Sequence, residues 1–97
     1  MANNNKKFYD LRLYIIGKTG KSESALKTSK YICGTHFQSN CHLEIIDLLE
    51  RPEMGAEDQI LATPILVRKH PTPELRIMGD LTEMQKVIDY LEIKSEE

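Results

Sequence analysis

Hydrophobic and polar residues alternate near the start of the chain in the way that a half-buried strand requires. Between residues 9 and 16, apolar side chains occupy alternate positions before the run becomes wholly apolar at its end, and a period of two residues is that of a β-strand. From Ser22 to Phe37, apolar residues recur at helical spacing. The pattern predicts a strand over 9–16, a loop over 17–21, and a helix from Ser22, its expected N-cap, to Phe37.

A second apolar run, from Leu43 to Leu48, predicts another buried strand. Strand, helix and strand in this order form a right-handed βαβ unit, which makes the two strands parallel. The charged stretch from Arg51 to Gln59 has Pro52 near its start and predicts a short helix or a single helical turn.

The stretch from Ile60 to Leu81 predicts a β-hairpin. Its strands would run from Ile65 to Lys69 and from Glu74 to Met78, separated by His70-Pro71-Thr72-Pro73. Pro64 stands at the entrance of the first of these strands, where a missing N–H is tolerated, and a cis Thr63-Pro64 bond is our hypothesis for it. The next residues predict a turn that begins at Gly79, with Asp80 or Thr82 as the N-cap of a following helix.

The last element is an amphipathic helix marked by apolar residues at helical spacing: Met84, Val87, Ile88 and Leu91. We expect a flexible tail over residues 1–8, one domain over 9–93, and a frayed tail over 94–97. The order of elements predicts an α/β protein with the thioredoxin-like arrangement βαβ(α)ββα in three layers. One modest core is all that a chain of 97 residues supports.

Composition narrows the range of partners. A net charge of -2 and a pI of about 5.9 leave no basic excess, so we expect no nucleic-acid partner. We also expect no membrane partner and a cytoplasmic location, because there is no apolar run of spanning length and the sequence begins with polar residues. The two cysteines, Cys33 and Cys41, are too few for a secreted scaffold, so we expect a reducing compartment and no structural disulfide.

The segment from Gly17 to Ser22 follows a strand, opens a helix and ends in Gly-Lys-Ser, as a phosphate-binding P-loop does. A P-loop requires a glycine five positions before Gly20, where this chain has Ile15 inside the strand. This spacing argues against nucleotide hydrolysis. No cysteine occurs in the segment either, so the thioredoxin-like fold would lack its redox dithiol there. We therefore expect no enzyme activity and no cofactor.

Cysteine and histidine residues between α-helical and β-strand patterns offer an alternative chemistry. Cys33, His36, Cys41 and His42 are residue types that zinc accepts. Cys41 and His42 are neighbours in a strand, however, and should point to opposite faces. We favour a core cysteine with surface histidines, and keep a thiol or metal-binding protein using Cys33 and Cys41 as the alternative function.

Two long segments, LRLYIIGKTGKSESALKTSK and IIDLLERPEMGAEDQILATPILVRKHPTPELRIMGDL, resemble the KaiB family of small clock proteins. The resemblance runs from about Leu11 to Leu81. Its specific parts are Leu13-Tyr14 with Gly17 and Thr19, Ala25-Leu26-Lys27, Glu57-Asp58, Ile60 to Pro64, and Arg76-Ile77 with Gly79-Asp80-Leu81.

The resemblance implies a non-enzymatic regulator that docks on a KaiC-like ATPase and modulates its phosphorylation cycle. It also implies two arrangements of the chain: a resting homo-oligomer, a dimer or tetramer, with the order βαββααβ, and a thioredoxin-like monomer that binds the partner. A histidine kinase of the clock output is a second partner to be expected. From about Arg51 onward, the switch exchanges helix for strand, which requires two packings of similar free energy.

Departures from the family pattern concern both the switch and the partner. Clock members commonly carry glycine where this chain has Tyr90, and replacing a glycine inside a helix favours the helix by up to about 1 kcal/mol. We therefore expect a bias toward the thioredoxin-like arrangement. Clock members tend to have basic residues where this chain has Ser24, Glu44 and Gln59. A reversed charge weakens a complementary interface, so a divergent, non-clock branch with another ATPase is also to be considered.

Four matched residues are candidates for partner contact or for the structure of the switch region: Lys27, Asp47, Arg76 and Asp80. Pro64, Gly79 and Tyr90 are the expected structural positions. The acidic residues between Glu50 and Asp58 are a further candidate surface for a partner.

Overall fold

The computed structural model describes residues 7–79 and 81–93 of the chain. Along the sequence these residues form the elements β1 (Tyr9–Ile15), α1 (Gly20–Tyr31), β2 (Cys41–Asp47), α2 (Pro52–Glu57), β3 (Ile65–His70), β4 (Leu75–Met78) and α3 (Met84–Leu91). A π-helical turn, η1 (Ile32–His36), and a 3-10 turn, η2 (Gln38–Asn40), connect α1 to β2. Residues 1–6 of the tail predicted over 1–8, and the tail predicted over 94–97, lie outside the described residues.

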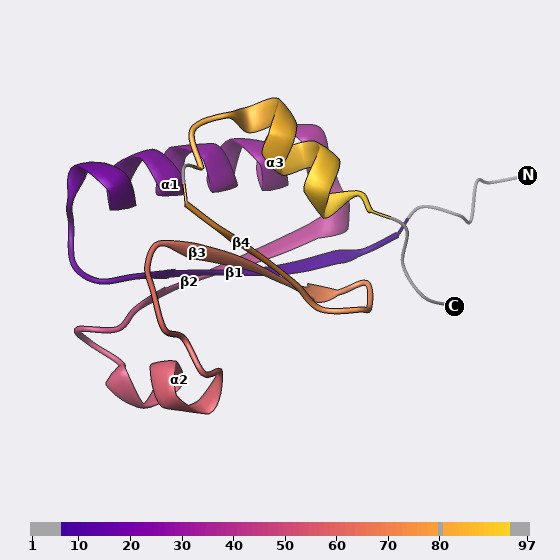
Figure 1. Ribbon diagram of the computed structural model, residues 1–97. Coiled ribbons are helices and arrows are strands. Elements are labelled where there is room, and N and C mark those ends of the chain that lie inside the picture. Colours follow the sequence, from indigo (N-terminus) through magenta and orange to yellow (C-terminus); the bar gives the residue numbers. More distant parts are fainter. Residues whose placement is uncertain (1–6, 80, 94–97) are drawn as a thin grey trace, which may run out of the picture.

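The strands form a four-stranded sheet in the order β2-β1-β3-β4. β1 runs parallel to β2 and antiparallel to β3, and β4 runs antiparallel to β3. Figure 1 shows α1 and α3 over one face of the sheet and the short α2 on the other face. This is the predicted three-layer arrangement, and the described chain does not have the alternative order βαββααβ. None of the helices in 7–79 and 81–93 combines the length and apolar character that crossing a bilayer needs.

Alternation along β1 divides the core between the two faces of the sheet. Leu11, Leu13 and Ile15 pack beneath α1 and α3, while Tyr14 packs on the side of α2. The larger core joins these strand residues to apolar side chains from the helices: Ala25, Ile32, Phe37, Val87, Ile88 and Leu91. The smaller core consists of Tyr14, Ile46, Ile65 and Val67. Two faces of one strand thus bury apolar groups, as the wholly apolar end of β1 indicated.

The start of α1 lies earlier than predicted. Thr19, not Ser22, is the N-cap, with an extended backbone. The Thr19 Oγ1 accepts a hydrogen bond from the Ser22 N–H at 3.1 Å, which satisfies one of the free donors of the first helical turn. At its other end α1 stops at Tyr31, and η1 continues the helical course to His36.

The prediction of no structural disulfide is wrong, because Cys33 and Cys41 form one. Their Cα atoms are 5.4 Å apart, within the range that a disulfide spans. The two short turns η1 and η2 return the chain so tightly that β2 begins beside the end of the α1 helix. The two cysteines are eight residues apart in the sequence, and this spacing alone did not indicate that their side chains would meet.

The hairpin and the last helix follow the prediction, except at the helix start. The Thr63-Pro64 bond is cis, as hypothesised, and His70-Pro71 and Thr72-Pro73 are also cis. α3 begins at Met84 with Glu83 at the cap position and no side-chain cap. Thr82 is therefore not the N-cap, and Asp80 lies outside the described residues.

Arg68 is a buried cation within the aliphatic strand β3, and the sequence pattern did not predict its burial. Its side chain is fully buried and donates hydrogen bonds to three backbone oxygens: Leu91 at 2.8 Å, Ile93 at 2.9 Å and Pro73 at 2.8 Å. Burial lowers the pKa of the guanidinium, but an arginine remains protonated at neutral pH. The charge lies at the carboxyl end of α3, where the helix dipole favours a cation. Arg68 thus joins α3 and the hairpin loop to β3.

Candidate partner-binding surface

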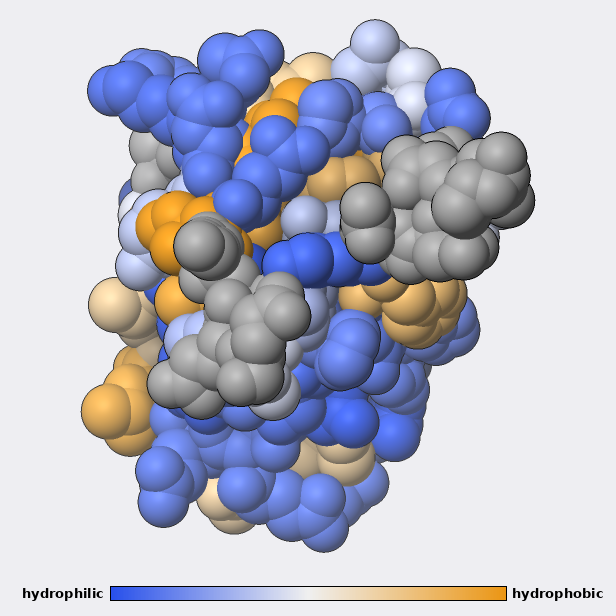
Figure 2. Space-filling view, turned by 90° about the vertical axis from the view of Figure 1, so that its right-hand side faces the viewer, coloured by the Kyte–Doolittle hydropathy of each residue, from blue (hydrophilic) through white to orange (hydrophobic). Residues whose placement is uncertain are grey.

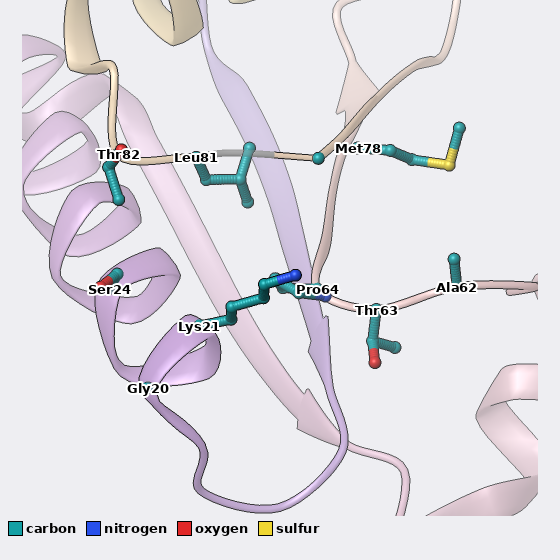
Figure 3. A pocket seen from close by; sticks show the side chains of 10 residues that line it. Gly20, Lys21, Ser24, Ala62, Thr63, Pro64, Met78, Leu81 and Thr82 are labelled. Atoms are coloured by element: carbon teal, nitrogen blue, oxygen red, sulfur yellow. The ribbon is translucent and has the colours of Figure 1, made fainter.

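A groove of about 820 Å³ opens between α1, the loop before β3 and the connection from β4 to α3. Figure 3 shows Lys21 extending from the first turn of α1 toward Pro64. Gly79, with a φ of 90°, turns the chain at the rim; this left-handed backbone is one that glycine adopts without strain. Apart from Lys21, the lining consists mainly of small and apolar groups: Gly20, Ser24, Ala62, Thr63, Pro64, Met78, Gly79, Leu81 and Thr82.

Large apolar side chains are exposed around this groove. Leu61 is 96% exposed, Leu49 68% and Met78 63%. Met78 pairs with the first residue of β3, and Leu49 follows the end of β2, so these side chains belong to the same end of the sheet. Ile16, just after β1, is also exposed. We call the groove together with Ile16, Leu49 and Leu61 the groove end. Exposed apolar groups gathered in one place are typical of an interaction site.

Asp47 fixes the backbone of the groove end. Its Oδ1 accepts hydrogen bonds from the N–H of Gly17 and the N–H of Leu49, each at 3.0 Å. The hydrogen bond from Gly17, followed by that from Leu49, holds the pKa of the Asp47 carboxyl below its usual value. Gly17 has a φ of 65°, and a Cβ added there would lie 3.0 Å from the Leu49 side chain. The loop between β1 and α1 therefore requires both the carboxylate and the glycine.

The same hydrogen bonds bear on the nucleotide hypothesis. A P-loop turns its backbone N–H groups toward a phosphate. Here the Gly17 N–H is bound by Asp47 and the Ser22 N–H by Thr19. These two N–H groups of the loop are thus already hydrogen-bonded to oxygens of the protein itself.

Charged residues from distant parts of the chain meet on the sheet face that α2 partly covers. Arg12 Nη1 donates to Asp58 Oδ2 at 2.8 Å, and Lys69 Nζ lies 3.7 Å from Asp58 Oδ1. Lys69 also pairs with Glu74 at 3.2 Å. Arg76 completes the row, with Nε 3.1 Å from Glu74 Oε2. We call Arg12, Asp58, Lys69, Glu74 and Arg76 the charged face.

Arg76 has a second function within the charged face. It donates to the backbone oxygen of Gln59 at 3.1 Å and to that of Asp58 at 2.6 Å, which holds the end of the α2 segment against β4. Partial burial of Glu74 would raise its pKa, but hydrogen bonds from Arg76 and Lys69 outweigh this, so the pKa lies below its usual value.

Two of the three residues at which we expect a departure from the family pattern, Glu44 and Gln59, border the charged face. Glu44 Oε2 lies 3.2 Å from Arg51 Nη1, and Glu44 Oε1 lies 3.8 Å from Arg12 Nε. Gln59 has a φ of 55° and offers its carbonyl to Arg76. The third departure, Ser24, lines the groove. The negative charge of Glu44 is therefore compensated inside this protein by two arginines.

The structure places the predicted residues at separate sites. Lys27 is exposed on α1, Asp47 ends β2 and Arg76 lies on β4, and because β2 and β4 are opposite edges of the sheet, Asp47 and Arg76 do not share a site. Pro64 and Gly79 both belong to the groove. Tyr90 is 41% exposed on α3, inside a helix, as expected for that position. Asp80 lies outside the described residues.

The end of the sheet opposite the groove has a different character. There Tyr9 faces Cys41 across the strand pair, and its ring stacks on Phe37 with centroids 3.9 Å apart. Burial, then the nearby Glu92, raises the Tyr9 pKa. Figure 2 looks onto this end, where the atoms that are not grey are mostly hydrophilic and the apolar ones form separate groups. We call Tyr9, Phe37, the Cys33–Cys41 pair and their neighbours the disulfide end.

Three of the four candidate zinc residues, Cys33, His36 and Cys41, lie at the disulfide end and make other interactions. Both sulfurs belong to the disulfide. His36 Nε2 lies 2.8 Å from Glu92 Oε2 and its ring meets that of Phe37 edge-on. Within residues 7–79 and 81–93, no three His, Cys, Asp or Glu side chains are grouped so as to hold a metal ion.

Comparisons of the fold define the class of protein. The solution structure of the N-terminal domain of SasA from Synechococcus elongatus matches with a TM-score of 0.70 at 18% identity, covering 99% of this chain and 94% of that one. The thioredoxin Deadhead from Drosophila melanogaster also matches with a TM-score of 0.70, at 15% identity, covering 91% of this chain and 81% of that one. The chain has a thioredoxin-like fold.

Sequence comparisons define the family. The family model described as KaiB domain matches residues 12–93. A circadian clock oscillator protein KaiB from Microcystis aeruginosa is 45% identical, covering 95% of this chain and 88% of the relative. Another from Synechococcus elongatus is 44% identical, covering 91% and 86%. The chain belongs to the KaiB family, and the resemblance read from the sequence is confirmed.

Proposed function

We propose that this protein is a non-enzymatic clock regulator that docks on a KaiC-type ATPase and modulates its phosphorylation cycle. The observation that carries the proposal is the thioredoxin-like arrangement with residues 84–91 as a helix, because the family resemblance associates this arrangement with the partner-binding state. A histidine kinase of the clock output is a second proposed partner. We further propose a cytoplasmic location and a resting homo-oligomer.

The groove end is the proposed docking surface. It combines the exposed apolar side chains of Leu49 and Leu61 with the cation of Lys21, and interface centres typically combine apolar anchors with a few charged groups. Asp47 and Gly17 act behind this surface, since their hydrogen bond fixes the loop that ends β1. Asp47 is thus a positioning residue here, and Lys27, which is exposed on α1, is a further candidate for partner contact.

A thiol-dependent enzyme on the same fold is the alternative that the sequence left open. The thioredoxin reaction needs a reactive cysteine at a helix N-terminus, where the dipole stabilises a thiolate. Here α1 begins with Gly20 and Lys21, and the two cysteines lie at the opposite end of the sheet from the groove. This placement supports a binding module over a redox catalyst.

Size-exclusion chromatography with light scattering tests the proposal. The chain is run alone and mixed with the KaiC-type ATPase of its own source, with ATP and with ADP. We expect a complex with the ATPase and a measurable change in its phosphorylation time course. Separate elution with both nucleotides would contradict the proposal, and a pull-down with the clock histidine kinase would then test the second partner.

Replacement of Leu61 by glutamate tests the docking surface. The side chain is 96% exposed, so the free energy of unfolding should change by less than about 0.5 kcal/mol. A charge placed in an apolar contact should weaken the complex about tenfold, which corresponds to about 1.4 kcal/mol. Tyr31→Glu, at a half-exposed aromatic residue near the other end of α1, is the matched control. Equal weakening by both variants would argue against the groove end.

A further inference from the structure

We propose that Cys33 and Cys41 form a reversible redox modification site that fastens the end of α3 to the body of the protein. The two Cα atoms are 5.4 Å apart and the sulfurs are bonded in the structure. The chain contains only these two cysteines, so no other intrachain pairing competes. The site lies at the disulfide end, away from the groove.

The turn that the disulfide closes contains two residues that contact other parts of the chain. Between Cys33 and Cys41 lie His36, which pairs with Glu92 at the end of α3, and Phe37, which stacks on Tyr9 at the start of β1. The link joins the end of the helical segment to the first residue of β2. Formation of the disulfide therefore restrains the turn that contains His36 and Phe37, and reduction removes this restraint.

The surroundings of the sulfurs indicate how exchange would proceed. Cys33 is 8% exposed and lies near the carboxyl end of a helical segment, where the dipole disfavours a thiolate. Cys41 is less buried and begins β2, an edge strand. Cys41 is thus the more accessible of the two cysteines, and we assign the exchange with an external thiol or disulfide to it.

A small disulfide such as oxidised glutathione is the oxidant by chemical class. The Cys41 thiolate attacks one sulfur of oxidised glutathione, whose S–S bond breaks and releases one glutathione thiolate. The Cys33 thiolate then attacks the Cys41 sulfur of the mixed disulfide and releases the second glutathione. The two cysteine thiols lose two electrons and two protons, and the oxidant becomes two glutathione thiols, so the step is balanced.

Alkylation and hydrogen exchange test the site on the full chain. The protein is equilibrated in glutathione buffers of increasing oxidised fraction, free thiols are alkylated, and mass spectrometry counts them. We expect both thiols to disappear together in a monomeric product. Amide exchange in 32–41 and 84–93 should then be about tenfold slower than in the reduced protein, and the melting temperature should be about 10 °C higher. Exchange around residues 17–24 should stay unchanged.

The double variant Cys33→Ser/Cys41→Ser is the control, since it should resemble the reduced protein in every buffer. Three results would overturn the proposal: two thiols that stay free in fully oxidised glutathione, a product linked between chains, or a disulfide whose reduction leaves the exchange of 84–93 unchanged. A double variant that fails to fold does not remove the test, because the thiol count and the exchange comparison use the unmodified chain.

Discussion

The groove end and the disulfide end of the same sheet are built in different ways. Around the groove, Leu49 and Leu61 are exposed, and hydrogen bonds to Asp47 hold the loops. At the opposite end, a covalent bond, a ring stack and a histidine–carboxylate pair join three parts of the chain, and buried Arg68 binds the end of α3. Side chains that fasten the fold are thus separated from side chains available to a partner. A substitution at the disulfide end should therefore change the stability of the fold, and one at an exposed residue of the groove end should change partner binding.

The largest expected effect is that of Arg68→Ala. Removing the guanidinium leaves the carbonyl oxygens of Leu91, Ile93 and Pro73 without their donor, and buried unsatisfied groups are costly. We expect a loss of about 3 kcal/mol in the free energy of unfolding, measured by urea denaturation. Lys30→Ala, at an exposed cation on α1, is the control. A loss below about 1 kcal/mol would show that Arg68 does not fasten α3.

An intermediate effect is expected for Asp58→Asn, which tests how much the charged face contributes to stability. The variant removes the carboxylate that faces both Arg12 and Lys69. We expect a loss of about 1 kcal/mol that shrinks as salt is added, because these groups are only partly buried. Glu83→Gln, in an exposed pair with Lys86, should cost close to nothing. Equal losses of stability for the two variants at low salt would show that the charged face contributes no more than an exposed ion pair.

The smallest effect concerns the groove end and depends on pH. Because the pKa of Asp47 is lowered by folding, its contribution is fully present above the unfolded pKa of about 3.9 and is lost as pH falls through the folded value. The unmodified protein should therefore lose more stability between pH 5 and 3 than Asp47→Asn, in thermal melts compared across about that pH range. Glu74 titrates in the same direction in both proteins, so it cancels in the comparison. Parallel curves would contradict this account.

Much of the fold was predictable because period and proline placement are local properties of the sequence. The alternation along β1, the helical spacing of 84–91 and the strand entrance at Pro64 each determine one element, and all three predictions are confirmed. The start of α1 was missed because Ser22 and Thr19 both suit a cap, and only the backbone conformation decides between them.

The charged face, the contacts of Arg68 and the disulfide were less predictable, because they join residues from separate elements of the chain. Arg12 meets Asp58 across 46 positions, and a charge pattern does not reveal such a partner. Arg68 was hidden because a cation inside an apolar strand is noticed only when its acceptors, the carbonyls of α3, are in place. The disulfide depended on two irregular turns for which the sequence has no periodic signal.

The sheet order also determines how the chain can be assembled during synthesis. Of the four described strands β1 is made first, yet it lies in the interior of the sheet between β2 and β3. Its parallel partner β2 is available after α1, whereas its antiparallel partner β3 begins only at Ile65. A nascent β1-α1-β2 unit therefore presents an open row of hydrogen-bonding groups along β1, which is a template for pairing with any strand. When β3 is made, it pairs with this open edge of β1 and closes it.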